Sequence, residues 1–217
     1  MKGLETLFFL ILFSSALGTS IKNRIVGGQD AVQGQFPYQV SWCYDDERTG
    51  QCINHCAGSI YNDKTIITSA HCCNAVKSQW HNWKIIAGEL DLSVSSGFEQ
   101  IRKIQNYLIH PDFDPSSFNN DICLLTLDSA LEWNKNIQRI TLDEMDETST
   151  QCLVSGWGAK GNGELADILQ WIEVTVDSDD YCYENVDGFD NETMICAQTP
   201  VSKSIICIWV SILFTHI

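Results

Sequence analysis

Basic residues are scarce in this chain. Its 217 residues include 13 Lys and Arg against 28 Asp and Glu, a formal net charge of −15. An acidic surface repels nucleic acid and anionic membranes, so we expect neither as a partner. The acidity does not choose among soluble functions, because net charge governs solubility rather than fold.

The chain also lacks an apolar run long enough to cross a bilayer. The runs at residues 7–13 and 205–214 are much shorter than the ~20 residues of a membrane-spanning helix. The first run follows Lys2 and precedes small residues near Gly18, which is the pattern of a secretory signal. We therefore expect a signal peptide at residues 1–18 and a secreted, extracellular protein without a membrane anchor. The second run is typical of aggregation-prone segments, although it could also form a buried strand.

No Cys-x-x-Cys pair with zinc spacing occurs, although the chain contains ten cysteines. In an oxidising compartment so many cysteines indicate a disulfide framework. Metal binding is the alternative interpretation, and the adjacency of Cys72 and Cys73 disfavours it.

Helical periodicity is scarce, and the clearest helix start is Ser178, an expected N-cap for a short helix at 178–182. Elsewhere, short apolar runs alternate with clusters of Gly, Asn, Asp and Pro, which favours a barrel or a sandwich of many strands. The polar, acidic stretch at 132–150 could link two halves, and no internal repeat is present. The expected strands are residues 38–42, 64–69, 84–87, 101–109, 121–127, 151–155 and 169–176.

Three short sequences contain residue types used in acyl transfer. They are Thr-Ser-Ala-His-Cys at 68–72, Asn-Asn-Asp-Ile-Cys-Leu-Leu at 119–125 and Cys-Leu-Val-Ser-Gly-Trp-Gly at 152–158. Each alone is weak, because a lone histidine is more often a surface or core residue and a lone aspartate before a strand is usually a turn residue. Their order is more specific, since Ile-Val-Gly-Gly at 25–28 precedes them directly behind Arg24.

Together these sequences resemble the trypsin-like (chymotrypsin-fold, S1) serine proteases over about residues 25–198. Phe-Pro-Tyr-Gln-Val at 36–40, Ala-Gly-Glu-Leu-Asp at 87–91 and Met-Ile-Cys-Ala at 194–197 are similar to arthropod digestive trypsins. The resemblance implies an all-β chymotrypsin-like fold of two six-stranded β-barrels, with the site between them. We expect the first barrel at about 25–132, an incomplete second barrel at about 133–198 and an unrelated apolar tail at 199–217.

The resemblance also implies how the chain is processed and which partners it binds. Residues 19–24 would be an activation propeptide, removed when a trypsin-like protease cleaves between Arg24 and Ile25. The precursor would then be a zymogen. The expected partners are protein or peptide substrates, protease inhibitors and that activating protease.

By the same resemblance, His71 is the general base and Asp121 is its orienting partner. A serine hydroxyl is a poor nucleophile at neutral pH and needs a neighbouring base. Imidazole titrates near neutrality, so it can take the proton and return it. A buried carboxylate selects the tautomer of the imidazole and stabilises the imidazolium that forms.

The sequence contains no match to the family motif that carries the nucleophilic serine. In the family, Met-Ile-Cys-Ala leads into Gly-Asp-Ser-Gly-Gly-Pro, whereas here the remaining serines are Ser202, Ser204 and Ser211. Ser211 is near the expected position, but apolar residues flank it and no glycine pair forms the turn of an oxyanion hole. We therefore predict that the nucleophilic serine, the oxyanion hole, the specificity pocket and the carboxylate partner of the Ile25 amine are missing. The second barrel would have an open edge.

The cysteines fit the same interpretation. Eight of them are expected in four disulfides: Cys56–Cys72 and Cys182–Cys196 as family pairs, Cys73–Cys123 beside the two triad residues, and Cys43–Cys52 in a local loop. Cys152 and Cys207 are left without partners, because the family partner of Cys152 lies beyond the serine.

Two further sites are implied. Glu89 and Glu99 match two carboxylates of the family's calcium loop, whereas Ser96 replaces a third. Since the number of carboxylates sets calcium affinity, calcium is the one cofactor considered and it is expected to bind weakly, if at all. Asn191-Glu-Thr193 is a glycosylation sequon.

Three hypotheses about function remain. The first is a truncated serine endopeptidase, whose sequence becomes foreign after residue 198. The second is a secreted pseudoprotease that binds inhibitors, substrates or other partners without hydrolysis, and the third is a misfolded product. The unbroken match before the tail favours the first.

Overall fold

The computed structural model describes residues 28–46, 52–76, 82–142, 151–158 and 164–199, together with the backbone of 205–209 and 215–216. The expected signal peptide, the propeptide and the cleavage pair Arg24 and Ile25 lie outside these residues. So do Ser202, Ser204 and Ser211. None of the described helices is both long and apolar enough to span a membrane.

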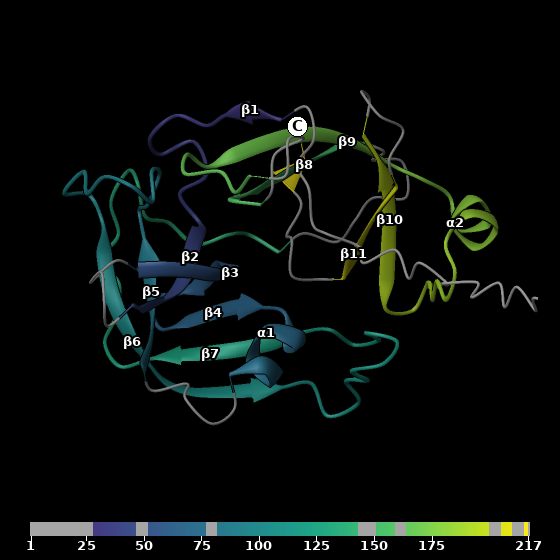
Figure 1. Cartoon of the computed structure of the whole chain (residues 1–217), viewed down its shortest axis with the longest axis horizontal. Helices are drawn as coiled ribbons and strands as arrows, with labels where there is room; N and C mark the ends of the chain where they lie inside the picture. The colour runs from purple at the N-terminus through teal and green to yellow at the C-terminus, as the bar shows by residue number, and fades with distance from the viewer. Residues whose placement is uncertain are drawn as a thin grey trace, which may run out of the picture.

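The first half of the chain forms a closed antiparallel barrel (Figure 1), with strands paired in the order β2-β3-β4-β7-β6-β5. The strands are β2 (Gln39–Asp45), β3 (Cys52–Asn62), β4 (Thr65–Thr68), β5 (Trp83–Ala87), β6 (Gln100–Ile109) and β7 (Cys123–Leu127). Alternate side chains point into the barrel, as the burial of β7 shows: Cys123, Leu125 and Leu127 are almost completely buried. The expected first barrel is confirmed.

The described strands of the second half form a six-stranded sheet, with the path β11-β10-β9-β8-β12 and β1 paired to β9, and do not close into a barrel among themselves. Its strands are β1 (Gln29–Asp30), β8 (Gln151–Gly156), β9 (Gln170–Val176), β10 (Met194–Gln198), β11 (Ile205–Trp209) and β12 (Thr215–His216). Two short helices complete the described structure, α1 (Ala70–Ala75) and α2 (Asp179–Asn185).

All seven strands expected from the sequence are present, and their ends differ from the prediction by three residues at most. The helix after Ser178 is also confirmed, because the Ser178 side chain accepts a hydrogen bond from the Tyr181 N–H. The sequence did not predict β3, α1 or β10. Polar residues at Asn54 and His55 interrupt the apolar pattern in β3, where neither side chain is fully buried.

The apolar segment after residue 200 extends both ends of the second sheet. The backbone of β11 pairs with β10, with Cys207 opposite Cys196, and the backbone of β12 pairs with β8, with His216 opposite Cys152. The sequence left open whether the run at 205–214 forms a strand or is an aggregation-prone segment. A strand is formed at Ile205–Trp209. The edge of β10 is paired, and β11 becomes the outer strand of the described sheet.

Candidate active site

Asp121 lies just before β7, at the end of a loop with unusual backbone geometry. Phe118 and Asn120 have φ angles of 61° and 57°, in the left-handed region that asparagine tolerates and phenylalanine seldom adopts. Such strain is concentrated at functional sites. The loop delivers Asp121 to the interior, where only 1% of its surface is exposed.

His71 is the second residue of α1, which follows β4 after Ser69, and Asp121 holds it by two contacts. One carboxylate oxygen accepts the His71 backbone N–H at 2.7 Å, and the other is 2.7 Å from His71 Nδ1. A carboxylate only accepts, so the Nδ1 contact places a proton on that nitrogen. In the neutral ring, Nε2 is then the proton acceptor, which is the arrangement of a general base.

The free side of the imidazole faces sulfur rather than a hydroxyl. Nε2 is 3.3 Å from the Sγ atom of Cys72, and the Phe118 ring meets the imidazole edge-on with centroids 5.8 Å apart. The His71 side chain is 35% exposed. Among the described residues, no serine or threonine hydroxyl is hydrogen-bonded to Nε2. The structure thus brings His71 and Asp121 together, and within the residues that it describes no serine or threonine side chain is bonded to the base.

Four disulfides are formed, in the pairs that the sequence predicted: Cys43–Cys52, Cys56–Cys72, Cys73–Cys123 and Cys182–Cys196. Cys152 is a free, buried thiol, and burial raises its pKa. The side chain of Cys207 lies outside the described residues. Since Cys73 and Cys123 neighbour the base and its partner in sequence, their disulfide ties α1 to the start of β7.

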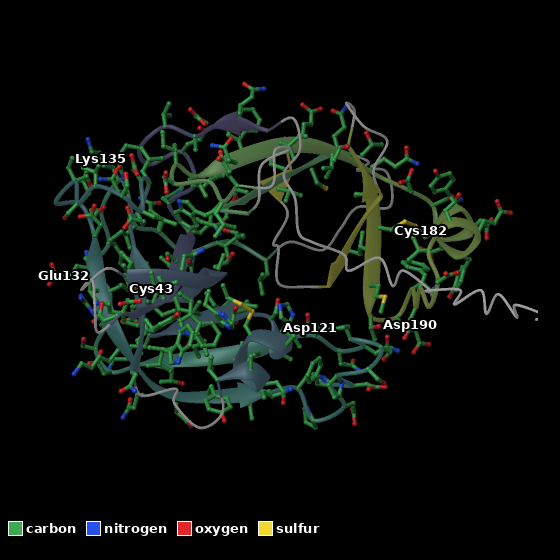
Figure 2. All side chains as sticks on the ribbon, in the orientation of Figure 1. Cys43, Asp121, Glu132, Lys135, Cys182 and Asp190 are labelled. Atoms are coloured by element: carbon green, nitrogen blue, oxygen red, sulfur yellow. A yellow bond between two sulfur atoms is a disulfide. The ribbon has the colours of Figure 1, made fainter. Side chains whose placement is uncertain are left out.

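Two hydrogen bonds join the first half of the chain to the second half. The Asn119 amide donates to an Asp190 carboxylate oxygen at 3.0 Å, and the Ser155 hydroxyl donates to the Gln39 side chain at 2.8 Å. In Figure 2, Asp121 lies on the side of the barrel nearest β10, and Asp190 lies beside the end of β10. The base therefore lies between the two halves, as the resemblance implied.

Sequence reasoning missed Phe118 and His55. His55 packs against two tryptophans that also contact each other, with ring centroids 4.7 Å from Trp83 and 6.1 Å from Trp42. Burial lowers the pKa of His55, and the charge of His71 lowers it further. Nothing in the sequence marked either residue, because their roles depend on contacts across strands.

The loop that contains Glu89 and Glu99 and resembles a calcium site is stabilised by hydrogen bonds within the loop. The Glu99 carboxylate accepts the Ser96 N–H at 2.6 Å, the Ser96 hydroxyl at 2.8 Å and the Gly97 N–H at 2.8 Å. Partial burial acts to raise the pKa of Glu99, but these hydrogen bonds lower it overall. Glu99 is therefore already satisfied without a cation.

Glu89 supports the same conclusion. Burial raises its pKa to about 7, and the charge of Glu99 adds to the shift. Calcium takes 6–8 oxygen ligands, and a Glu89 carboxylate oxygen already accepts the Leu90 N–H at 3.0 Å. With Ser96 in place of a third carboxylate, Glu89 and Glu99 do not fit a calcium site.

The sequon residue Asn191 is exposed, in the turn between α2 and β10. Its amide nitrogen donates to Asp179 at 3.0 Å, and its amide oxygen accepts the Tyr183 hydroxyl at 2.8 Å. A glycan on that nitrogen would compete with the Asp179 contact. Position and exposure are compatible with modification.

Comparisons with known proteins agree with this geometry. The family model described as Trypsin matches residues 25–211, which reaches beyond residue 198 into the segment expected to be unrelated. Trypsin-1 of Astacus astacus is 38% identical over 183 residues, covering 81% of this chain and 75% of the relative. Trypsin beta of Drosophila erecta is 33% identical over 206 residues, covering 87% and 77%. The solved structure of GrC has a TM-score of 0.68 at 24% identity, covering 80% of this chain and 75% of that one, and supports the fold alone.

Proposed function

Because the chain belongs to the trypsin family of serine proteases, we propose that it is a secreted, zymogen-type serine endopeptidase polypeptide that lacks its nucleophile as printed. The observation that carries this proposal is the His71–Asp121 pair, with Nδ1 and the backbone N–H both held at 2.7 Å and Nε2 without a hydroxyl partner among the described residues. Proteases of this kind act on proteins or peptides. Here we expect no peptide-bond hydrolysis.

The chemistry supports that expectation. In a complete site, His71 would remove the proton of the attacking hydroxyl while Asp121 stabilised the imidazolium. Nothing replaces the attack on the carbonyl carbon when the hydroxyl is missing. Because triad members act as a unit, the two that remain contribute little above the background rate.

The test is active-site labelling of the whole secreted chain. It would be purified, cleaved with immobilised trypsin behind Arg24, and exposed to a fluorophosphonate probe and an arginine ester substrate. We expect neither labelling nor hydrolysis, whereas a complete trypsin treated identically should give both. His71-dependent labelling of Ser211, abolished in both Ser211→Ala and His71→Ala variants, would contradict the proposal.

Secretion and the zymogen form are tested separately. Intact mass of the secreted chain should correspond to a first residue near Thr19, and brief trypsin treatment should create Ile25 as the new N-terminus. Retention of residues 1–18 in the secreted material would refute the signal peptide. The absence of cleavage behind Arg24 in a folded sample would refute the propeptide.

A non-catalytic binding role is the second candidate. It is favoured by the extension of the second sheet at both ends by β11 and β12, which supports a folded domain without a complete site. Saturable, reversible binding of an immobilised macromolecular trypsin inhibitor by the cleaved chain, with no hydrolysis, would support it. No binding at micromolar concentration would argue against it.

A further inference from the structure

The base of this site contacts a disulfide. His71 Nε2 is 3.3 Å from Cys72 Sγ, and that sulfur is bonded to Cys56. Within the described part of the chain, Cys56, His71 and Cys72 are the one group of three or more His, Cys, Asp or Glu side chains whose ligand atoms all lie within 4.8 Å of one another. Because the two sulfurs are bonded to each other, the group is not a metal site in this form.

We propose that Cys56–Cys72 is a thiol-exchange site at which His71 acts as the acid. The substrate class is a small thiol or dithiol of the glutathione type. The proposal stands on this contact and is independent of whether the chain hydrolyses peptides.

The two sulfurs differ in accessibility, and this sets the direction of the reaction. Cys56 is partly exposed, whereas Cys72 is 3% exposed. An incoming thiolate therefore attacks Cys56 Sγ, since exchange requires access to the attacked sulfur. The contact with His71 is made by the other sulfur, which is the leaving group.

The step balances without a further reactant. The thiolate forms a bond to Cys56 Sγ, and the electron pair of the broken S–S bond passes to Cys72 Sγ. The proton released when the incoming thiol ionises is taken up at His71 Nε2, and the ring then donates it to Cys72 Sγ or remains paired with that sulfur as an imidazolium. A second thiol then displaces Cys56 from the mixed disulfide, so one protein disulfide is reduced and one small-molecule disulfide is formed.

Asp121 completes the arrangement. Its carboxylate holds His71 Nδ1 at 2.7 Å, so it stabilises the imidazolium that faces the departing sulfur. A neighbouring histidine cation favours thiolate over thiol at a cysteine. Once reduced, Cys72 thus has the neighbours of an activated cysteine nucleophile, namely a histidine and the carboxylate that orients it.

The chain contains a matched control disulfide. Cys43–Cys52 also joins a buried cysteine, at 0% exposure, to a partly exposed one. No hydrogen bond or close contact between a histidine and either of its sulfurs is found among the described residues. The other two disulfides, Cys73–Cys123 and Cys182–Cys196, have cysteines exposed by 1% or less.

The experiment is timed exposure of the whole oxidised chain to glutathione at pH 7, followed by isotope-coded alkylation and peptide mass spectrometry. We expect Cys56–Cys72 to open about tenfold faster than Cys43–Cys52, with the first glutathione adduct on Cys56, because acid catalysis assists only the former. Equal rates, or a first adduct on Cys72, would overturn the proposal.

Variants distinguish acid catalysis by His71 from faster opening caused by local unfolding. His71→Gln should lower the Cys56–Cys72 rate to that of the control disulfide, and Asp121→Asn should lower it partly, while the Cys43–Cys52 rate stays unchanged. A parallel rise in the control rate would indicate local unfolding instead. If His71→Gln does not fold, the order of opening and the adduct position in the unaltered chain still decide the question.

Discussion

The barrel and the second sheet differ in how completely they are closed. Every strand of the barrel has a partner on both sides, so it has no edge, and it contains three of the four disulfides. The described second sheet ends at β11 and β12, has one disulfide and contains the free thiol of Cys152. An edge is a liability that full closure removes.

This difference shows which half of the molecule holds the His71–Asp121 pair in place. His71 and Asp121 both belong to the barrel, and the disulfide Cys73–Cys123 connects their neighbours within it. Their geometry therefore depends on the closed half of the molecule. What an endopeptidase would need from the other half can be missing without disturbing them.

Removing disulfides should give the largest contrast between the halves. Loss of Cys73–Cys123, which spans 50 residues, should lower the free energy of unfolding by about 4 kcal/mol in the loop-entropy account. Loss of Cys182–Cys196, which spans 14, should cost about 3 kcal/mol. Urea unfolding of paired alanine variants measures both. A larger loss from the second-sheet pair would contradict the view that the barrel is the more constrained half.

Core truncations should show the same order with a smaller effect. Ile85, at 0% exposure, packs inside the barrel, whereas Ile172, at 5%, packs in the smaller core of the second sheet. We expect Ile85→Ala to cost about 3 kcal/mol and Ile172→Ala about 2, since a sheet with open ends relaxes around a cavity more readily. Equal losses would show that the two cores are equally rigid.

Glu89 gives a prediction for pH. Its pKa in the folded chain is about 7 against an ordinary value of 4.5, so the folded state holds a proton that the unfolded chain releases between these values. Stability should therefore fall as pH rises from about 4.5 to 7. Glu89→Gln should remove this penalty, stabilising the chain at pH 8 by about 1 kcal/mol after solvent screening and not at pH 4.5. Thermal unfolding at both pH values is the measurement, and a gain that is independent of pH would refute the assignment.

The smallest effect is expected at the helix of the second half. Ser178→Ala removes the cap of α2 and should cost about 0.5 kcal/mol, near the low end for caps because the helix is short and its hydrogen bond is 3.3 Å long. Ser178→Asp is the control and should retain stability. Amide exchange at Tyr181 should accelerate in the alanine variant alone, and no difference between the variants would contradict the capping role.

Much of this could be predicted from local sequence. Alternating apolar residues located seven strands, and a single serine located α2. The strand β3 was not predicted because polar residues, Asn54 and His55, occupy its less buried end and interrupt the alternation of apolar side chains. The Phe118 backbone and the contact between His71 and Cys72 could not be predicted, because both arise from how distant strands meet.

The continuity of the barrel in sequence has a consequence for the order of folding. All six of its strands lie between Gln39 and Leu127, whereas the second sheet joins segments as far apart as Gln29 and His216. During synthesis, all six strands of the barrel are made before β8, and domains of this kind fold as units. His71 and Asp121 can therefore meet on a nascent chain, before α2, β10 and the Asp190 contact of the second half have been added.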